Sequence, residues 1–439
     1  MSTPKLQKYL RKRATTRPVV FGRSVPTPIR RVVVIPAYEE AEHLPRTIES
    51  LENVPEASLS DTLVLAVVNN PPLGSSPFPE QGAAHRVAAD NRRTLAWLQA
   101  HSRVTPLQLA WIDASSPGNE LAAPGGVGQA RKIGSDSALL TICETHETGG
   151  HRFDPSRTVL LHLDADTLVQ EDYLDAADEL LGYGTAGGAI AYAHSPADSA
   201  AGQHAIDCYE LFMRHYVHGL AWAGSPYAFH TVGSTMACTC SGYVQSDGMP
   251  GKRQAGEDFY FLQQLAKVGG VHQLRSTTVY PSPRISDRVP FGTGPRMADA
   301  LCNGNEDFNA YDTRTFAEVR RILQAVTTAS APSAESILAA VDAPETADFL
   351  LAKGLALTMP RLRKQHQHRG RLIQAFHQWF DGLATFRLIH HLTETRWPQR
   401  TLLEAWQDLL SREGCVAPTN DVSALLDWCR SVAPGETER

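Results

Sequence analysis

Two carboxylates directly follow a short apolar run in the stretch Thr158-Val-Leu-Leu-His-Leu-Asp-Ala-Asp166. The run is almost continuously apolar, which is typical of a strand in a sheet that is covered on both faces. In sheets of parallel strands, ligands bind outside the carboxyl ends of the strands. The stretch therefore predicts a buried strand that places Asp164 and Asp166 at a binding edge.

The residues before this stretch alternate between strand and helix patterns. Three further apolar runs predict strands: Arg31–Pro36, Thr62–Val68 and Leu107–Ile112. The segments between them have apolar residues at helical spacing. This alternation predicts βαβ units and an α/β fold with a mostly parallel sheet. The strand ends at Pro36, Asn69 and Asp164 should then share one edge of the sheet and form one site.

Composition changes along the chain and suggests three parts. Residues 1–31 carry nine Lys or Arg and no Asp or Glu, so 1–30 is predicted to be a basic, flexible arm. Such an arm is a candidate for contact with an anionic lipid surface, an acidic partner or RNA. The α/β domain is expected over 31–297. From residue 298 strand patterns disappear, and 298–439 is expected to be a helical domain.

Charge and apolar patterning exclude several functional classes. The formal net charge is −6, so no overall basic field indicates nucleic-acid binding. The chain has no run of about 18 apolar residues, which argues against a transmembrane segment. The seven cysteines include no C-x-x-C pair, which suits reduced thiols. These features predict a cytoplasmic protein.

The Asp164-Ala165-Asp166 motif has two readings. Two carboxylates two residues apart at a strand end can face one hard cation, Mg²⁺ or Mn²⁺. Such a cation would stabilise a diphosphate leaving group. Alternatively, the two side chains are loop carboxylates that cap the following helix.

A second acidic pair, Glu257-Asp258, opens the predicted helix Phe259–Lys267. Acidic residues in the first turn are favoured by the helix dipole, so the pair has a purely structural reading. The functional reading is a general base that takes a proton from an acceptor hydroxyl.

Taken in order, three motifs resemble the signature of family 2 glycosyltransferases: V-V-V-I-P-A-Y-E-E at 32–40, D-A-D at 164–166 and G-E-D at 256–258. The resemblance covers about residues 31–290. The segment Gly128–Gly134 is similar to a glycine-containing segment of that family. The resemblance implies a GT-A fold, which is Rossmann-like with helices on both faces of the sheet. It also implies a nucleotide-diphosphate sugar as donor.

The resemblance further implies roles for individual residues on the donor side. The wall around the nucleotide base and ribose would comprise Pro36, Ala37, Tyr38 and Glu39. The next strand ends in Asn69-Asn70, where family members usually have an acidic residue that contacts the base. Arg131 or Lys132 would neutralise the diphosphate. Asp164 would hold ribose or a metal-bound water, with Ala165 beside it, and Asp166 would ligate the metal.

On the acceptor side, the resemblance makes Asp258 the base of an inverting transfer, with Glu257 supporting the acceptor. The segment from Arg284 to Gly294 is basic and contains glycine. Its arginines Arg284 and Arg288 are candidate clamps on the pyrophosphate, although a plain connection to the helical domain is an equal reading. His230–Met236 is a candidate acceptor-side loop.

The resulting hypothesis is a metal-dependent glycosyltransferase of the hexosyltransferase type that transfers a sugar to an unidentified hydroxyl acceptor, with inversion. One alternative is a retaining enzyme like those that make glyceryl glycosides. Two others are a nucleotidyltransferase and a non-catalytic nucleotide-sugar-binding protein. The expected lack of a membrane span argues against a processive polysaccharide synthase and favours a soluble or peripheral acceptor.

Overall fold

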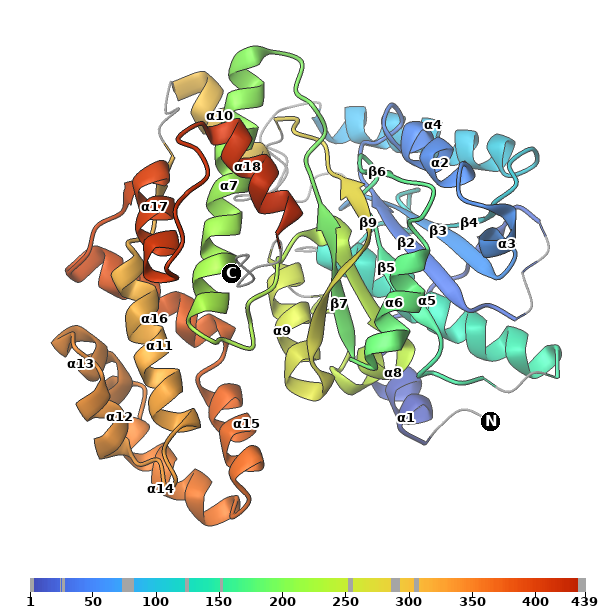
Figure 1. Ribbon diagram of the computed structural model, residues 1–439. Helices are drawn as coiled ribbons and strands as arrows, with labels where there is room; N and C mark the ends of the chain where they lie inside the picture. Colours follow the sequence, from blue (N-terminus) through green and yellow to red (C-terminus); the bar gives the residue numbers. More distant parts are fainter. Residues whose placement is uncertain are drawn as a thin grey trace. The chain divides into compact units, whose positions relative to one another are not determined.

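The computed structural model describes residues 4–23, 25, 28–72, 83–122, 126–150, 153–251, 256–285, 293–303 and 308–432 (Figure 1). The chain divides into two compact units. Unit 1 consists mainly of Met1–Ser195 and Thr231–Ser282, and unit 2 mainly of Pro196–His230 and Gly292–Arg439. The second unit thus begins about a hundred residues before the predicted boundary at 297, because Pro196–His230 belongs to it.

Unit 1 is built on a nine-stranded sheet with the order β1-β4-β3-β2-β5-β8-β7-β9-β6. The strands are β1 (Val20–Phe21), β2 (Arg31–Ala37), β3 (Thr62–Asn69), β4 (Gln108–Ala114), β5 (Val159–His162), β6 (Leu168–Val169), β7 (Gly187–Tyr192), β8 (Met236–Thr239) and β9 (Val271–Tyr280). The strands β4, β3, β2 and β5 run parallel, as do β7 and β9, whereas the short strands β1, β6 and β8 pair antiparallel. The predicted α/β class with a mostly parallel sheet is confirmed.

The strand order creates a switch point between β2 and β5. The chain first adds β3 and β4 on one side of β2, and then crosses to add β5 on the other side. Ligand sites of doubly wound sheets lie at such a reversal. Arg31 is in register with Val159 and Val34 with His162. The carboxyl ends of β2 and β5, predicted to share one edge, therefore lie side by side.

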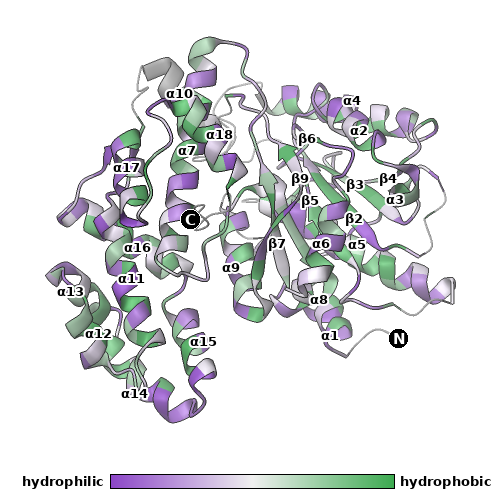
Figure 2. Cartoon of the chain, in the orientation of Figure 1, coloured by the Kyte–Doolittle hydropathy of each residue, from purple (hydrophilic) through white to green (hydrophobic). Residues whose placement is uncertain are grey.

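Both faces of the central strands are covered. All eight residues of β3 are buried, although successive side chains point to opposite faces of the sheet. Figure 2 shows the central strands as largely hydrophobic. The helices of unit 1 are α1 (Pro4–Lys12), α2 (Leu44–Glu52), α3 (Glu56–Leu59), α4 (Ala83–His101), α5 (Val127–Thr148), α6 (Asp175–Tyr183), α8 (Cys240–Gln245) and α9 (Glu257–Gly269).

Helix α5 approaches the sheet closely at Gly134. A Cβ atom on Gly134 would lie 2.5 Å from Val34 Cγ1 and 2.9 Å from Val67 Cγ2. Only a residue without a side chain allows α5 to pack this tightly on β2 and β3. This contact fixes the position of Arg131, which lies one helical turn before Gly134.

The N-terminal segment is folded onto unit 1, in contrast to the flexible arm predicted for residues 1–30. Leu6 and Tyr9 of α1 are buried. The hydroxyl of Tyr9 donates a hydrogen bond of 2.7 Å to Asp136, a fully buried residue of α5. Asp136 also accepts bonds from the Tyr243 hydroxyl at 2.9 Å and from the Thr15 amide at 2.6 Å. These bonds satisfy a buried carboxylate that would otherwise be costly.

Unit 2 is helical, as predicted for the C-terminal part of the chain. Its helices are α7 (Ala200–Trp222), α10 (Thr293–Asn303), α11 (Thr313–Thr327), α12 (Ala334–Ala340), α13 (Pro344–Ala352), α14 (Leu355–Gln365), α15 (Arg369–Trp379), α16 (Gly382–Thr395), α17 (Leu402–Arg412) and α18 (Val422–Ser431). A small sheet pairs β10 (Asn309–Ala310) with β11 (Arg400–Thr401). Phe316, Phe376 and Leu388 lie in the hydrophobic core of unit 2. No helix in the described ranges is long and apolar enough to cross a bilayer.

Candidate active site

A buried arginine connects the two acidic motifs. Arg131 lies on α5 and is only 2% exposed. Its Nη2 donates to Asp164 Oδ1, and its Nη1 donates to Glu257 Oε1. Asp164 follows β5, and Glu257 is the first residue of α9. The structure thus brings together three predicted site residues from distant parts of the chain.

Two glycines make this arrangement possible. A Cβ atom on Gly128 would lie 2.9 Å from Glu257 Cβ, so α5 and the start of α9 approach closely at this residue. A Cβ atom on Gly233 would lie 2.4 Å from Arg131 Nη2. Gly233 belongs to the predicted acceptor-side loop and here packs against the guanidinium group. Both glycines lie in segments singled out in the sequence, but neither was predicted to pack against a site residue.

Replacing Gly233 by Ala is expected to destabilise unit 1 by about 1–3 kcal/mol, the usual cost of overpacking. The guanidinium group cannot move aside easily, because two carboxylates hold it. The measurement is the free energy of unfolding in urea. Gly182→Ala is a matched control, since a Cβ atom there meets nothing within 4 Å. Equal stability of the two variants would contradict the close packing at Gly233.

The environment of Asp258 favours the protonated form of its carboxyl group. It is partly buried, and its Oδ1 accepts a 2.7 Å hydrogen bond from its neighbour's amide, Phe259 N–H. Burial and the negative charge of Glu257 raise the pKa of Asp258 to about 7, although the Phe259 amide and Arg131 act in the opposite direction. A carboxyl group with a pKa near neutrality can accept a proton and release it again.

Arg131 itself stays charged. Burial alone would lower its pKa, but the charges of Asp164, Glu257 and Asp258 outweigh burial and raise it. The guanidinium group is therefore a permanent positive charge among three carboxylates. It sets their separation and partly compensates their mutual repulsion.

The Asp164-Ala165-Asp166 motif forms a turn after β5. The Thr167 amide donates to the Asp164 carbonyl at 3.1 Å, and the Thr47 hydroxyl donates to the Ala165 carbonyl at 2.8 Å. Tyr173 is fully buried, and both its burial and the charge of Asp164 raise the pKa of its hydroxyl. These contacts fix the backbone that carries both carboxylates.

The donor atoms in this turn suit a hard cation. Asp164 and Asp166 are partly exposed, and the buried oxygens Thr167 Oγ1 and Tyr173 OH have no hydrogen-bond partner among the described residues. Among all the residues that the structure describes, no group of three or more His, Cys, Asp or Glu side chains is arranged to hold a metal ion. A cation here would take its remaining ligands from water and from phosphate oxygens, as Mg²⁺ commonly does.

Asn69 and Asn70 are buried in an amide network at the ends of β2 and β3. Asn69 Nδ2 donates to the Ala37 carbonyl at 3.1 Å. Asn91 of α4 donates to the Asn69 carbonyl at 3.0 Å and to Asn70 Oδ1 at 2.8 Å. The two asparagines therefore hold the predicted nucleotide wall in place. Asn91 completes the network and was missed, because its partners lie more than 20 residues away.

The predicted wall continues into a strained turn. Pro36 and Ala37 are buried at the end of β2, and Tyr38 and Glu39 follow, partly exposed. Glu39 has φ = 57°, a left-handed conformation that is uncommon for residues other than glycine. Its amide donates to Asn91 Oδ1 at 3.1 Å, and its carboxylate accepts from Arg86 Nε at 2.7 Å. Such strain tends to occur at functional sites.

Other predicted residues lie apart from this cluster. Lys132 pairs with Asp136 at 2.8 Å and so belongs to the contacts that hold the N-terminal segment. Arg284 falls within unit 2, and Arg288 lies outside the described residues. His230 also belongs to unit 2, where burial lowers its pKa to about 3 and keeps it neutral.

No known family model matches the chain, and neither does any curated protein. Among solved structures, S. aureus TarS 1–349 in complex with UDP-GlcNAc is 12% identical over 80% of this chain and 92% of that chain, with a TM-score of 0.35. The mannosyltransferase PcManGT from Pyrobaculum calidifontis, in complex with GDP-Man and Mn²⁺, is 15% identical over 86% of this chain and 93% of that one, with a TM-score of 0.34. A mycobacterial protein is 13% identical over 71% and 84%, with a TM-score of 0.30. At these values the similarities establish neither a family nor an activity.

Proposed function

We propose that this protein is a GT-A-type, family 2-like glycosyltransferase that uses a nucleotide-diphosphate sugar and inverts the transferred sugar. The observation that carries the proposal is the Arg131 bridge between Asp164 and Glu257 at the switch point of the sheet. It joins the two acidic motifs in one place and leaves Asp258 beside them with a pKa of about 7.

Asp258 is the proposed base. It would take the proton of the acceptor hydroxyl as that oxygen bonds to the anomeric carbon. The bond from this carbon to the diphosphate oxygen breaks in the same step, and the nucleoside diphosphate leaves. A single displacement of this kind inverts the anomeric centre. Glu257 is less suited to the role, because its carboxylate is bound to Arg131 and only 2% exposed.

On the donor side, the nucleotide would lie against Pro36–Glu39, with its diphosphate near Asp164 and Asp166. A bound Mg²⁺ or Mn²⁺ would supply positive charge to the leaving diphosphate. Asp166 is the first candidate to hold it, because it is partly exposed and the family resemblance makes it the metal ligand. Because Arg131 is buried, we propose a positioning role for it, in place of the diphosphate contact first expected of Arg131 or Lys132.

Donor binding is tested by thermal shift with UDP-, GDP-, ADP- and TDP-sugars, each with and without Mn²⁺. One nucleotide is expected to raise Tm, and most of the shift should require the metal. Asp166→Ala should lose the metal-dependent part, while Asp198→Ala, at an exposed site, should keep it. No shift with any donor would reject the proposed function. An undiminished Mn²⁺ effect in Asp166→Ala would reject only the metal assignment.

A further inference from the structure

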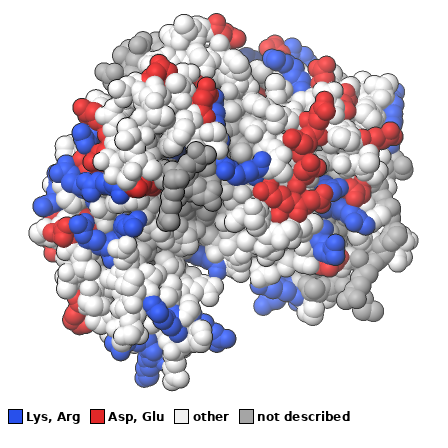
Figure 3. Space-filling view, viewed as in Figure 1, with Lys and Arg blue, Asp and Glu red and all other residues white. Residues whose placement is uncertain are grey.

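One part of unit 2 is strongly basic although the whole chain is acidic. Residues 349–380 contain six Lys or Arg and three His, but no Asp or Glu, in a chain of net charge −6. They include the whole of α14 and α15, which are neighbours along the chain and in space. Figure 3 shows Lys and Arg gathered at the lower end of this unit, where Figure 1 places α14 and α15.

The helix periodicity turns these charges outward. In α14 the buried residues Leu355, Thr358, Met359 and Leu362 form one stripe toward the core. In α15, Leu372 and Phe376 do the same. The other sides of the two helices carry exposed residues, and we define the α14–α15 face by five of them: Leu357, Arg361, Arg363, Lys364 and Arg371.

Most of the positive charge on the α14–α15 face is not neutralised within the protein. Across the described ranges, no carboxylate forms an ion pair with Arg361, Lys364 or Arg371. Arg363 lies close enough to Glu335 to lower the pKa of that carboxyl, after the larger effects of its own backbone amide and the Ser333 hydroxyl. An anionic partner would therefore meet at least three unpaired cations.

The same face carries an unusually exposed leucine. Leu357 is 83% exposed and lies one turn before Arg361 on α14. Leu351, at the end of α13, is 47% exposed. A bilayer with anionic lipids offers both kinds of contact, since its headgroups attract cations and its acyl boundary accepts an aliphatic side chain. Nucleic acid carries negative charge, but it has no apolar layer into which Leu357 could insert. The nearby Trp379 is partly buried, with Lys353 5.1 Å from its ring centre, so it is not available to stack on a base.

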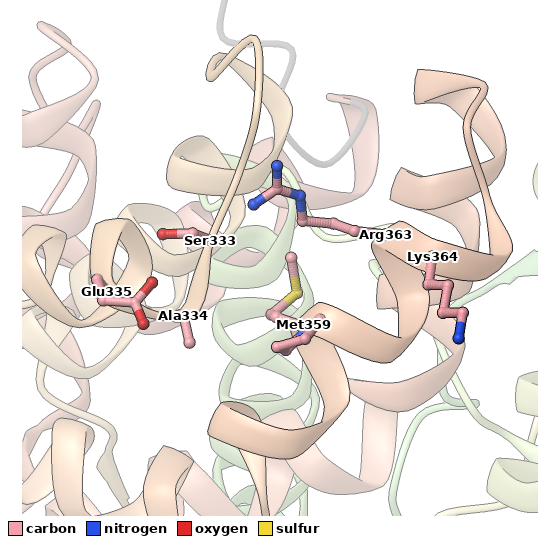
Figure 4. Close-up of a pocket in the computed structure, with 7 residues that line it drawn as sticks. Ser333, Ala334, Glu335, Met359, Arg363 and Lys364 are labelled. Atoms are coloured by element: carbon pink, nitrogen blue, oxygen red, sulfur yellow. The ribbon is translucent and has the colours of Figure 1, made fainter.

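A cavity of about 400 Å³ adjoins this face. It is lined by Ser333, Ala334, Glu335, Met359, Pro360, Arg363 and Lys364 (Figure 4). The Glu335 carboxylate in its lining would repel a phosphate group, and the Ser333 hydroxyl is already used to cap α12. The cavity is therefore a poor binding site for one specific lipid headgroup. The residues that would attract anions are those of the exposed α14–α15 face.

We propose that the α14–α15 face docks unit 2 onto the surface of an anionic lipid bilayer. Leu357 would enter the headgroup region while Arg361, Lys364 and Arg371 contact lipid phosphates. This inference is independent of the proposed glycosyl transfer. It also differs from membrane contact through the N-terminal segment, which is another basic surface of the chain and can be tested separately.

Co-sedimentation with phosphatidylcholine vesicles, with and without phosphatidylglycerol, tests the charge requirement. The full chain should bind only the anionic vesicles, and added salt should weaken binding. Each cation near such a surface contributes roughly fivefold in affinity, so the triple variant R361Q/K364Q/R371Q should lose about a hundredfold. The control K5Q/K8Q/K12Q removes three exposed charges from α1 and should bind normally. The reverse pattern would overturn the proposal.

Leu357→Ser tests the apolar contact and should weaken vesicle binding by about tenfold. Val104→Ser is its control, because Val104 is 75% exposed in unit 1. Unchanged Tm values would show that each variant is folded. Equal binding to neutral and anionic vesicles would reject the proposal. Tighter binding to duplex DNA than to anionic vesicles would also reject it, in favour of a nucleic-acid partner.

Discussion

Asp258→Asn is expected to lower sugar transfer by about 10²–10⁴-fold while leaving donor binding and folding intact. The reason is that an amide cannot accept the proton of the acceptor hydroxyl, and a general base contributes about this much to the rate. Donor binding should persist, because Asp164, Asp166 and the end of β2 are unchanged. The measurement is kcat/KM for transfer, together with the thermal shift caused by the donor.

The pH dependence should identify Asp258 more directly than the rate loss. Because its pKa is raised to about 7, the wild-type kcat/KM should fall as pH drops below about 7, and residual transfer by the variant should lack this limb. The free energy of unfolding should change in the opposite direction and rise as the pH drops. The folded protein holds the Asp258 proton between about pH 4 and pH 7, whereas the unfolded chain releases it, so this residue costs stability as pH rises through that window. The Asn variant should therefore be more stable than wild type at pH 8 and similar near pH 4, where the carboxyl group is largely protonated in both states.

Asp198→Asn serves as the control for Asp258→Asn, since Asp198 is an exposed carboxylate. It should leave both the rate and its pH limb unchanged. Full transfer activity in Asp258→Asn would reject Asp258 as the base and revive the retaining alternative. Loss of donor binding in that variant would instead assign Asp258 to the donor site.

The largest expected effect on stability comes from Arg131→Met. Removing the guanidinium group leaves Glu257, which is 2% exposed, without its cation, and deprives Asp164 of the same partner. Breaking a buried ion pair from one side typically costs about 3–5 kcal/mol. The free energy of unfolding in urea should fall by this amount.

The coupling within the pair is measured by a double-mutant cycle. Glu257→Gln should also destabilise the protein, but Arg131→Met combined with Glu257→Gln should lose less than the sum of the two. Arg86→Met is a matched control, because it breaks an ion pair whose arginine side chain is 63% exposed. Exposed pairs contribute about 0–1 kcal/mol. If Arg131→Met were no more harmful than Arg86→Met, Arg131 would not hold the site together.

The sheet and the shared edge at the ends of its parallel strands were predictable for simple reasons, whereas the approach of Glu257 to this edge was implied only by the resemblance to family 2 glycosyltransferases. The strands at Arg31, Thr62 and Val159 are continuous apolar runs, and parallel strands place their carboxyl ends at one edge. The burial of Arg131 was not predictable. It depends on Gly128 and Gly233, whose missing side chains matter only once the segments are known to touch.

The packing of the N-terminal segment was not predictable for a different reason. Its nine basic residues resemble a solvated arm, although Leu6 and Tyr9 of α1 are buried. The partner of Tyr9 is Asp136, 127 residues further along the chain. Similarly, the apolar residues at 201–222 predict a helix but do not indicate which core it covers. A local apolar pattern indicates that one face of a helix is buried. Which segment covers that face depends on how the whole chain folds.

The discontinuity of unit 2 has a consequence for biosynthesis. Helix α7 contacts α11, α17 and α18, all of which are made much later. Val422, the first residue of α18, leaves the ribosome 200 residues after Trp222, the last residue of α7. At about 5–20 residues per second, this delay is roughly 10–40 seconds. Throughout that interval the nascent chain carries an apolar helix without its final neighbours, so unit 2 can complete its core only after translation is nearly finished.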